Sequence, residues 1–121
     1  MNITVISVGK IKEKYFTAAI DEYSKRLSRF AKLNIIEVAD EKIPDNASEK
    51  EMEQIKEKEG NKILAKLPQN SFVVTLCIEG KEHSSEELAK KIADISMTSS
   101  HITFIIGGSL GLSDTVKSKS A

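Results

Sequence analysis

Residues 102–113 read Ile102-Thr-Phe-Ile-Ile-Gly-Gly-Ser-Leu-Gly-Leu-Ser113. The apolar, mostly β-branched run at the start of this stretch is typical of a buried strand, and the glycines that follow predict a loop. Ser113 and Asp114 then predict the beginning of a helix, because their side chains accept hydrogen bonds from the first N–H groups of a helix. A strand, a glycine-rich loop and a helix in this order indicate an α/β protein.

The rest of the chain repeats this alternation. Apolar segments predict strands at 3–8, 33–38, 72–78 and 102–106. Helices are expected from about residue 13 to 30, from 48 to 67 and from 84 to 95, because apolar side chains recur there every three or four residues. The pattern predicts a single α/β domain over residues 1–121, a mostly parallel sheet with helices on both faces.

Local signals refine the expected helices. Ser48 is a good N-cap for the second helix, and Ser84 with Glu87 predicts a capping box at the third. Gly60 falls in the middle of the second helix, where it either marks a close approach of another backbone or is merely tolerated. The first helix has a row of apolar positions: Phe16, Ala19, Ile20, Tyr23, Leu27 and Phe30.

Composition narrows the class of protein. The 121 residues are 40% hydrophobic and 30% charged, which predicts a packed core. No apolar run approaches the length of a membrane span, and the N-terminus does not resemble a secretory signal. The single cysteine, Cys77, excludes an internal disulfide or a multi-cysteine zinc site. We therefore expect a soluble, cytoplasmic domain without a metal.

The net charge of zero, from 18 basic and 18 acidic residues, conceals an asymmetry. Counting charged side chains gives +4 between Lys10 and Lys32 and −5 between Glu37 and Glu59. Either the basic segment attracts a polyanion, or both segments are solvated helix faces. If the segment binds RNA, the candidate contacts are Lys10, Lys12, Lys14, Arg26 and Arg29.

Two loops leave the carboxyl ends of predicted strands, where ligands bind in open α/β sheets. One spans 76–81 and the other spans 106–111. Glycines expose backbone N–H groups to a ligand, although such a loop is equally a simple turn. Neither loop has a dinucleotide or P-loop pattern. Glu79 is the only carboxylate near the expected site, Cys77 reads as a buried residue in the middle of its strand, and His83 and His101 read as structural or surface residues.

Several segments, taken in order, resemble the ribosomal large subunit methyltransferase H family of the SPOUT superfamily. The resemblance covers residues 1 to about 116 and is specific because six motifs occur together. They are Val8-Gly-Lys-Ile-Lys-Glu-Lys-Tyr15, Glu22-Tyr-Ser-Lys-Arg26, Asp40-Glu-Lys-Ile-Pro44, Lys58-Glu-Gly60, Thr75-Leu-Cys-Ile-Glu-Gly-Lys81 and Phe104-Ile-Ile-Gly-Gly-Ser-Leu-Gly-Leu112.

The resemblance implies S-adenosylmethionine-dependent methylation of N3 of a pseudouridine in 23S rRNA, by a homodimer. It implies cofactor contacts at Leu76, Gly107 and Gly108, with Ile78, Gly80 and Ser109 as further candidates. A side chain on Gly107 or Gly108 is then expected to fill the space of the cofactor.

Members of this family continue with a Pro-His segment and a Tyr-Arg-Ala stretch that this sequence does not contain. The departure predicts a truncated SPOUT fold without its C-terminal knot. It leaves the catalytic residues unassigned, because those of the family lie in that segment. It also keeps an alternative open, in which the chain is a non-catalytic remnant that binds RNA or a partner weakly or not at all.

Overall fold

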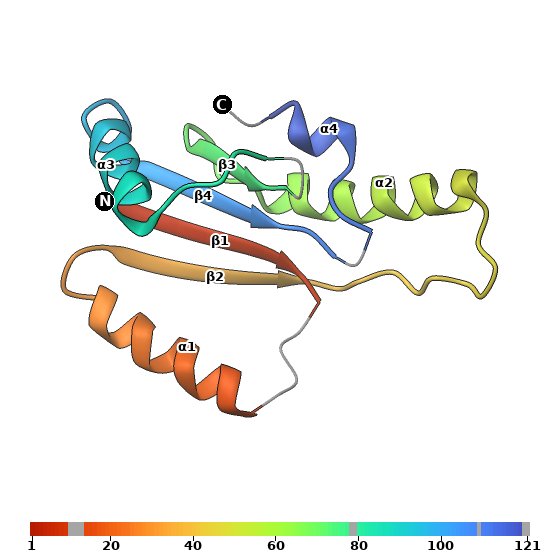
Figure 1. Cartoon of the computed structure of the whole chain (residues 1–121), viewed down its shortest axis with the longest axis horizontal. Coiled ribbons are helices and arrows are strands. Elements are labelled where there is room, and N and C mark those ends of the chain that lie inside the picture. The colour runs from red at the N-terminus through yellow and green to blue at the C-terminus, as the bar shows by residue number, and fades with distance from the viewer. Residues whose placement is uncertain (10–13, 78–79, 109, 120–121) are drawn as a thin grey trace.

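A computed structural model of the chain describes residues 1–9, 14–77, 80–108 and 110–119. Strands and helices alternate along it (Figure 1). The elements are β1 (Asn2–Val8), α1 (Lys14–Leu27), β2 (Lys32–Val38), α2 (Glu49–Lys66), β3 (Phe72–Leu76), α3 (Ser85–Ser96), β4 (His101–Ile106) and α4 (Asp114–Lys117).

The four strands form one sheet in the order β2-β1-β4-β3, and every neighbouring pair is parallel. Ile6 at the centre lies beside Ile36 of β2 and Ile105 of β4. Parallel neighbours require crossover connections, and the helices between the strands provide them. The parallel α/β sheet predicted from the alternation of strands and helices is therefore confirmed.

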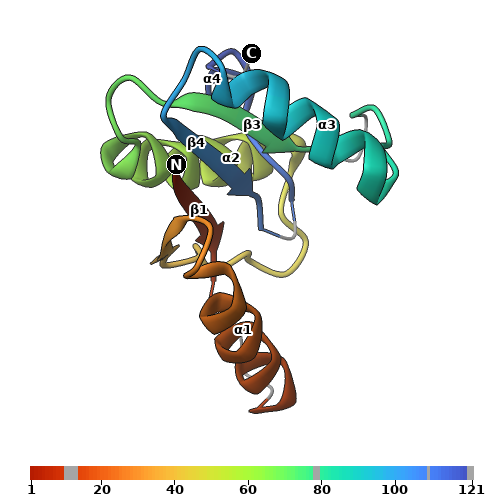
Figure 2. The same cartoon turned by 90° about the vertical axis from the view of Figure 1, so that its left-hand side faces the viewer.

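Helices cover both faces of the sheet, as predicted. On one face, Ile63 of α2 packs into the main core with Ile6 and Ile105, and Leu112 and Val116 complete that core. On the other face, Leu88, Ile92 and Ile95 of α3 share a cleft with Phe72, Val74 and Phe104. Figure 2 shows α2 and α3 on opposite sides of the strands.

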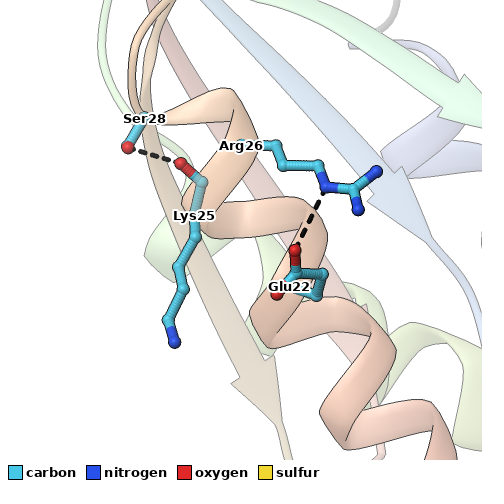
Figure 3. A network of polar contacts seen from close by, with 4 residues as sticks. All are labelled: Glu22, Lys25, Arg26 and Ser28. Atoms are coloured by element: carbon cyan, nitrogen blue, oxygen red, sulfur yellow. Dashed lines mark hydrogen bonds and ion pairs between the residues drawn. The ribbon is translucent and has the colours of Figure 1, made fainter.

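Helix α1 ends earlier than its apolar pattern predicts. It stops at Leu27, where the N–H groups of Phe30 and Ala31 both donate to the Leu27 carbonyl and turn the chain into β2. Ser28 Oγ also donates to the Lys25 carbonyl at 2.6 Å (Figure 3). The expected continuation to residue 30 is therefore wrong, because a turn takes over the last carbonyls of the helix. Phe30 lies outside the helix and is 79% exposed.

Three serines cap helices as the sequence predicts. Ser48 begins α2 and Ser84 begins α3, each in a capping box with the glutamate three residues later, Glu51 and Glu87. Ser113 Oγ accepts the N–H of Val116 at the beginning of α4. These caps satisfy helix N–H groups that otherwise have no partner within the helix.

The third strand is shorter than its apolar run predicts. β3 ends at Leu76, which pairs with Ile106, the last residue of β4. Cys77 therefore follows the strand instead of lying in its middle, and it is half-buried rather than fully buried. The reason is that β4 turns away at Gly107, so Cys77 has no strand residue opposite it. No helix of the described residues is long and apolar enough to span a bilayer.

Candidate functional site

The two strand-end loops meet at one pocket. Leu76 and Ile106 are the last paired residues of β3 and β4, and parallel strands end at the same edge of a sheet. The chain leaves both strands side by side, and a cavity of about 240 Å³ lies between the two exits. Its lining residues are Lys56, Leu76, Cys77, Ile106, Gly107, Gly108, Leu110, Gly111, Leu112 and Lys117.

The glycine-rich loop folds back on itself at this pocket. The Gly111 N–H donates to the Gly108 carbonyl at 3.0 Å, and Gly111 has a φ of 84°. Only glycine adopts that backbone conformation without strain. Gly107, Gly108 and Gly111 of this loop line the pocket together with Leu110 and Leu112.

Neighbouring atoms of the protein occupy the space into which a Cβ at position 107 or 108 would point. This corrects the expectation that a side chain there would fill the space of the cofactor. A Cβ on Gly107 would lie 2.9 Å from the Gly111 carbonyl carbon and 3.0 Å from Leu112 Cγ. A Cβ on Gly108 would lie 3.1 Å from Val8 Cγ1. Side chains at these positions would therefore displace the loop instead of filling the ligand space.

The pocket combines apolar and positively charged walls. Leu76 and Ile106 are large apolar residues that remain 53% and 41% exposed at the strand ends. Lys56 of α2 brings an ammonium group, whose Nζ lies 2.7 Å from Glu53 Oε1, and Lys117 lies at the other side. Such a pocket suits a ligand with an apolar ring and a negatively charged group.

A second cavity lies next to this pocket. A cleft of about 480 Å³ between α3 and the sheet shares Leu76 and Cys77 with it. The smaller pocket alone lies below the ~300–1,000 Å³ of most small-molecule sites, whereas the two cavities reach that range. A site for a cofactor the size of S-adenosylmethionine would therefore need both cavities, which meet at Leu76 and Cys77.

Of the other predicted cofactor contacts, only Gly80 lies among the described residues. Gly80 is exposed, donates its N–H to the Cys77 carbonyl at 3.1 Å and does not line the pocket. Ile78 and Ser109 lie outside the described residues, as does Glu79. His101 Nε2 lies 2.7 Å from Thr4 Oγ1 at the opposite end of the sheet, and His83 Nδ1 lies 3.7 Å from Glu87. In the part of the chain that the structure describes, no three potential metal ligands gather.

The structure describes only some of the basic side chains that are predicted to contact RNA. Lys10 and Lys12 lie outside the described residues, and Lys14 begins α1 without a described side chain. Arg26 and Arg29 line a shallow groove with Lys25 and Phe30, in the last turn of α1 and the residues that follow it. Arg26 Nε donates to Glu22 Oε1 at 3.1 Å (Figure 3). The groove is remote in sequence from both strand-end loops.

Sequence reasoning missed Glu59 of α2, which is only 5% exposed. A signal for it existed: Ile55, Glu59 and Ile63 are spaced four residues apart, so the carboxylate lies on the buried stripe of the helix. The Glu59 Oε2 atom accepts the N–H of Glu41, in the segment that follows β2, at 2.9 Å.

Comparison with known proteins finds relatives that share one name. A chain from Clostridium botulinum (strain Kyoto / Type A2) named ribosomal RNA large subunit methyltransferase H is 62% identical over 120 residues, covering 98% of this chain and 76% of the relative. A Methanococcus maripaludis chain named putative ribosomal RNA large subunit methyltransferase H is 63% identical over 117 residues, covering 96% and 74%. A Clostridium perfringens chain named ribosomal RNA large subunit methyltransferase H 1 is 62% identical over 117 residues, with the same coverage.

The sequence profile described as predicted SPOUT methyltransferase matches residues 1–121, the whole of the chain. The members of that family are methyltransferases that use S-adenosylmethionine. Together with the parallel α/β sheet and the pocket at its strand ends, this match shows that the chain belongs to the SPOUT methyltransferase family.

Proposed function

We propose that this chain is an rRNA methyltransferase that transfers a methyl group from S-adenosylmethionine to N3 of a pseudouridine in 23S rRNA. One observation carries the proposal: Leu76, Gly107 and Gly108 come together at one pocket. They do so in a chain that is 62% identical to a ribosomal RNA large subunit methyltransferase H over 120 residues.

We propose the pocket as the cofactor site. Leu76 and Ile106 offer apolar surface to an adenine ring, while the glycine loop offers backbone N–H and C=O groups for hydrogen bonds. Lys56 and Lys117 attract the carboxylate of the cofactor. Ile78, Gly80 and Ser109 are proposed as further contacts. When bound, the cofactor supplies an electrophilic methyl group on its sulfonium sulfur, and the protein contributes mainly by positioning.

The RNA-binding surface in this proposal is the basic stretch at the N-terminal end of the chain. Arg26 and Arg29, with Lys10, Lys12 and Lys14, attract phosphates of the rRNA. The exposed groove that Arg26 and Arg29 line supports this assignment. Because the proposed substrate is the ribosome, the protein acts in the cytoplasm.

The proposal also includes a homodimer. Large apolar side chains are exposed on α1, on the turn after it and on β2, at Tyr23, Leu27, Phe30 and Ile35. Large exposed apolar side chains on neighbouring elements are candidates for a protein interface, where they would be removed from water. A second copy of this chain is the partner that the proposal assigns to them.

Methyl transfer to ribosomes tests the proposal. Ribosomes that lack the modification are incubated with the 121-residue chain and radiolabelled S-adenosylmethionine, and digested 23S rRNA is analysed by mass spectrometry. We expect one methylated pseudouridine, at the position that the Clostridium botulinum relative methylates in a parallel reaction. Cofactor binding without any methyl transfer would contradict the proposed activity and favour the non-catalytic alternative.

A further inference from the structure

Glu59 is a charged residue in the interior of the protein. Its side chain lies on α2, one turn after Lys56 of the pocket and directly before the buried Gly60. Burying a carboxylate is unfavourable unless polar groups compensate for the lost water. The contacts of Glu59 therefore indicate what the buried charge does.

The first contact of Glu59 is with the segment that follows β2. Its Oε2 atom accepts the N–H of Glu41 at 2.9 Å. Lys62, one turn later, donates from Nζ to the Ala39 carbonyl at 3.1 Å and lies 2.8 Å from Glu41 Oε1. One turn of α2 thus holds residues 39–41 through a backbone N–H, a backbone carbonyl and an ion pair.

The second contact of Glu59 is with the glycine loop. A Cβ built on Gly108 would lie 3.3 Å from Glu59 Oε1 and 3.1 Å from Val8 Cγ1. Gly108 therefore lies close to the Glu59 carboxylate and to Val8, the last residue of β1. Glu59 thus lies between the segment that follows β2 and the loop that follows β4.

We propose that Glu59 is a positioning residue for the cofactor pocket, an inference that rests on the proposed function of that pocket. Glu59 does not line the pocket, so it acts through Gly108, which does. Its carboxylate sets the place of the glycine loop relative to the segment that follows β2. The acceptor oxygens of Glu59, and not merely its bulk, are needed for the cofactor to bind.

Three variants of the 121-residue chain separate the oxygen atoms of Glu59 from its size. Glu59→Gln keeps an acceptor oxygen and the shape, whereas Glu59→Leu keeps approximate size and removes both oxygens. Glu49→Gln changes an exposed carboxylate in the first turn of the same helix and is the matched control. Affinity for S-adenosylmethionine is measured by calorimetry well below the melting temperature of each variant. Exchange of the Glu41 amide hydrogen is followed by NMR in the cofactor-free chain.

We expect Glu59→Leu to weaken cofactor binding about tenfold or more and to speed Glu41 amide exchange by a similar factor, because a buried donor loses its acceptor. Glu59→Gln should stay within about threefold of the wild type in both measurements, and Glu49→Gln should match the wild type. If Glu59→Leu does not fold, Glu59→Asp, which withdraws the carboxylate by one methylene, takes its place.

A folded Glu59→Leu protein that melts earlier but binds the cofactor as tightly as the wild type would overturn the proposal, because Glu59 would then be structural only. Equal losses in Glu59→Gln and Glu59→Leu would also overturn it, since the acceptor oxygen would not be the cause. If the wild type itself binds no S-adenosylmethionine, the proposed function of the pocket fails. The exchange measurement still shows whether Glu59 holds the segment that follows β2.

Discussion

Gly60 and Ser113 touch where α2 crosses the beginning of α4. A Cβ on Gly60 would lie 2.6 Å from Ser113 Oγ and 3.0 Å from Val116 Cγ2. Ser113 is buried and its Oγ already accepts the N–H of Val116, so it has little freedom to move. Gly60 therefore does mark a close approach, but the side chains of Ser113 and Val116 make it, and not another backbone as the sequence suggested.

Replacing Gly60 by alanine should destabilise the protein by up to about 2 kcal/mol. Alanine favours the helix by ~1 kcal/mol, but overpacking a buried contact typically costs ~1–3 kcal/mol. Urea denaturation of Gly60→Ala measures the balance. Asn61→Ala, at an exposed position of the same helix, is the control and should be neutral or slightly stabilising. A Gly60→Ala protein more stable than the wild type would show that Ser113 can move and make room for the methyl group of alanine.

Substitution of Gly107 should weaken cofactor binding in proportion to the size of the new side chain. The Cβ already meets Gly111 and Leu112, so Gly107→Ala should shift the loop and Gly107→Val should abolish binding of S-adenosylmethionine. Calorimetry measures affinity, and far-UV circular dichroism checks that the fold remains. Undiminished affinity in Gly107→Val would remove the assignment of this loop to the cofactor.

Charge reversal at Arg26 and Arg29 should lower the affinity for ribosomes. It should also make that affinity less dependent on salt concentration. Each phosphate contact contributes about one unit to the slope of log affinity against log salt concentration, so the double variant should lose about two units. Filter binding over a series of salt concentrations measures the slope. Lys90→Glu, an exposed change on α3, is the control. An unchanged slope in the double variant would mean that this groove is only a solvated surface.

Charge at the apolar surface of α1 should dissociate the proposed homodimer. Phe30→Asp places a carboxylate at Phe30, which is more exposed than Tyr23, Leu27 or Ile35, and a partner subunit would have to desolvate it. Light scattering after size-exclusion chromatography should give the mass of one chain for the variant and of two for the wild type. A wild-type chain that is monomeric at all concentrations tested would contradict the dimer itself.

The pKa of Glu41 should report on the contact between α2 and the segment that follows β2. A hydrogen bond from Lys62, its positive charge and that of Lys58 hold the pKa of the Glu41 carboxyl below its usual range. The carboxylate therefore stabilises the fold above the usual glutamate pKa, and this contribution is lost as pH falls through the lowered value.

Lys62→Met should return the Glu41 pKa toward its usual range, as measured by NMR titration of the side-chain carboxyl. The pKa of Glu87 is an internal control, because hydrogen bonds from Ser84 lower it independently of Lys62. If Lys62→Met leaves the Glu41 pKa as low as in the wild type, Lys62 is not the cause of the shift.

Features that depend on a few neighbouring residues were predictable from the sequence. The caps at Ser48, Ser84 and Ser113 follow from hydrogen bonds that span only three residues. The alternation of apolar runs with helical patterns predicted the parallel sheet, and the positions of the strand ends predicted that the chain leaves β3 and β4 at one edge of the sheet. The individual residues Leu76, Gly107 and Gly108 came only from the family resemblance.

Features that depend on residues distant in sequence required the tertiary structure. β3 ends at Leu76 because β4 turns away after Ile106, and no residue near Leu76 encodes that turn. Likewise, Gly60 meets Ser113, and Glu59 is buried against Gly108, across about fifty residues of chain. Local sequence specifies hydrogen bonds and periodicity, whereas packing between elements decides which backbone positions lack room for a side chain and where a charge is enclosed.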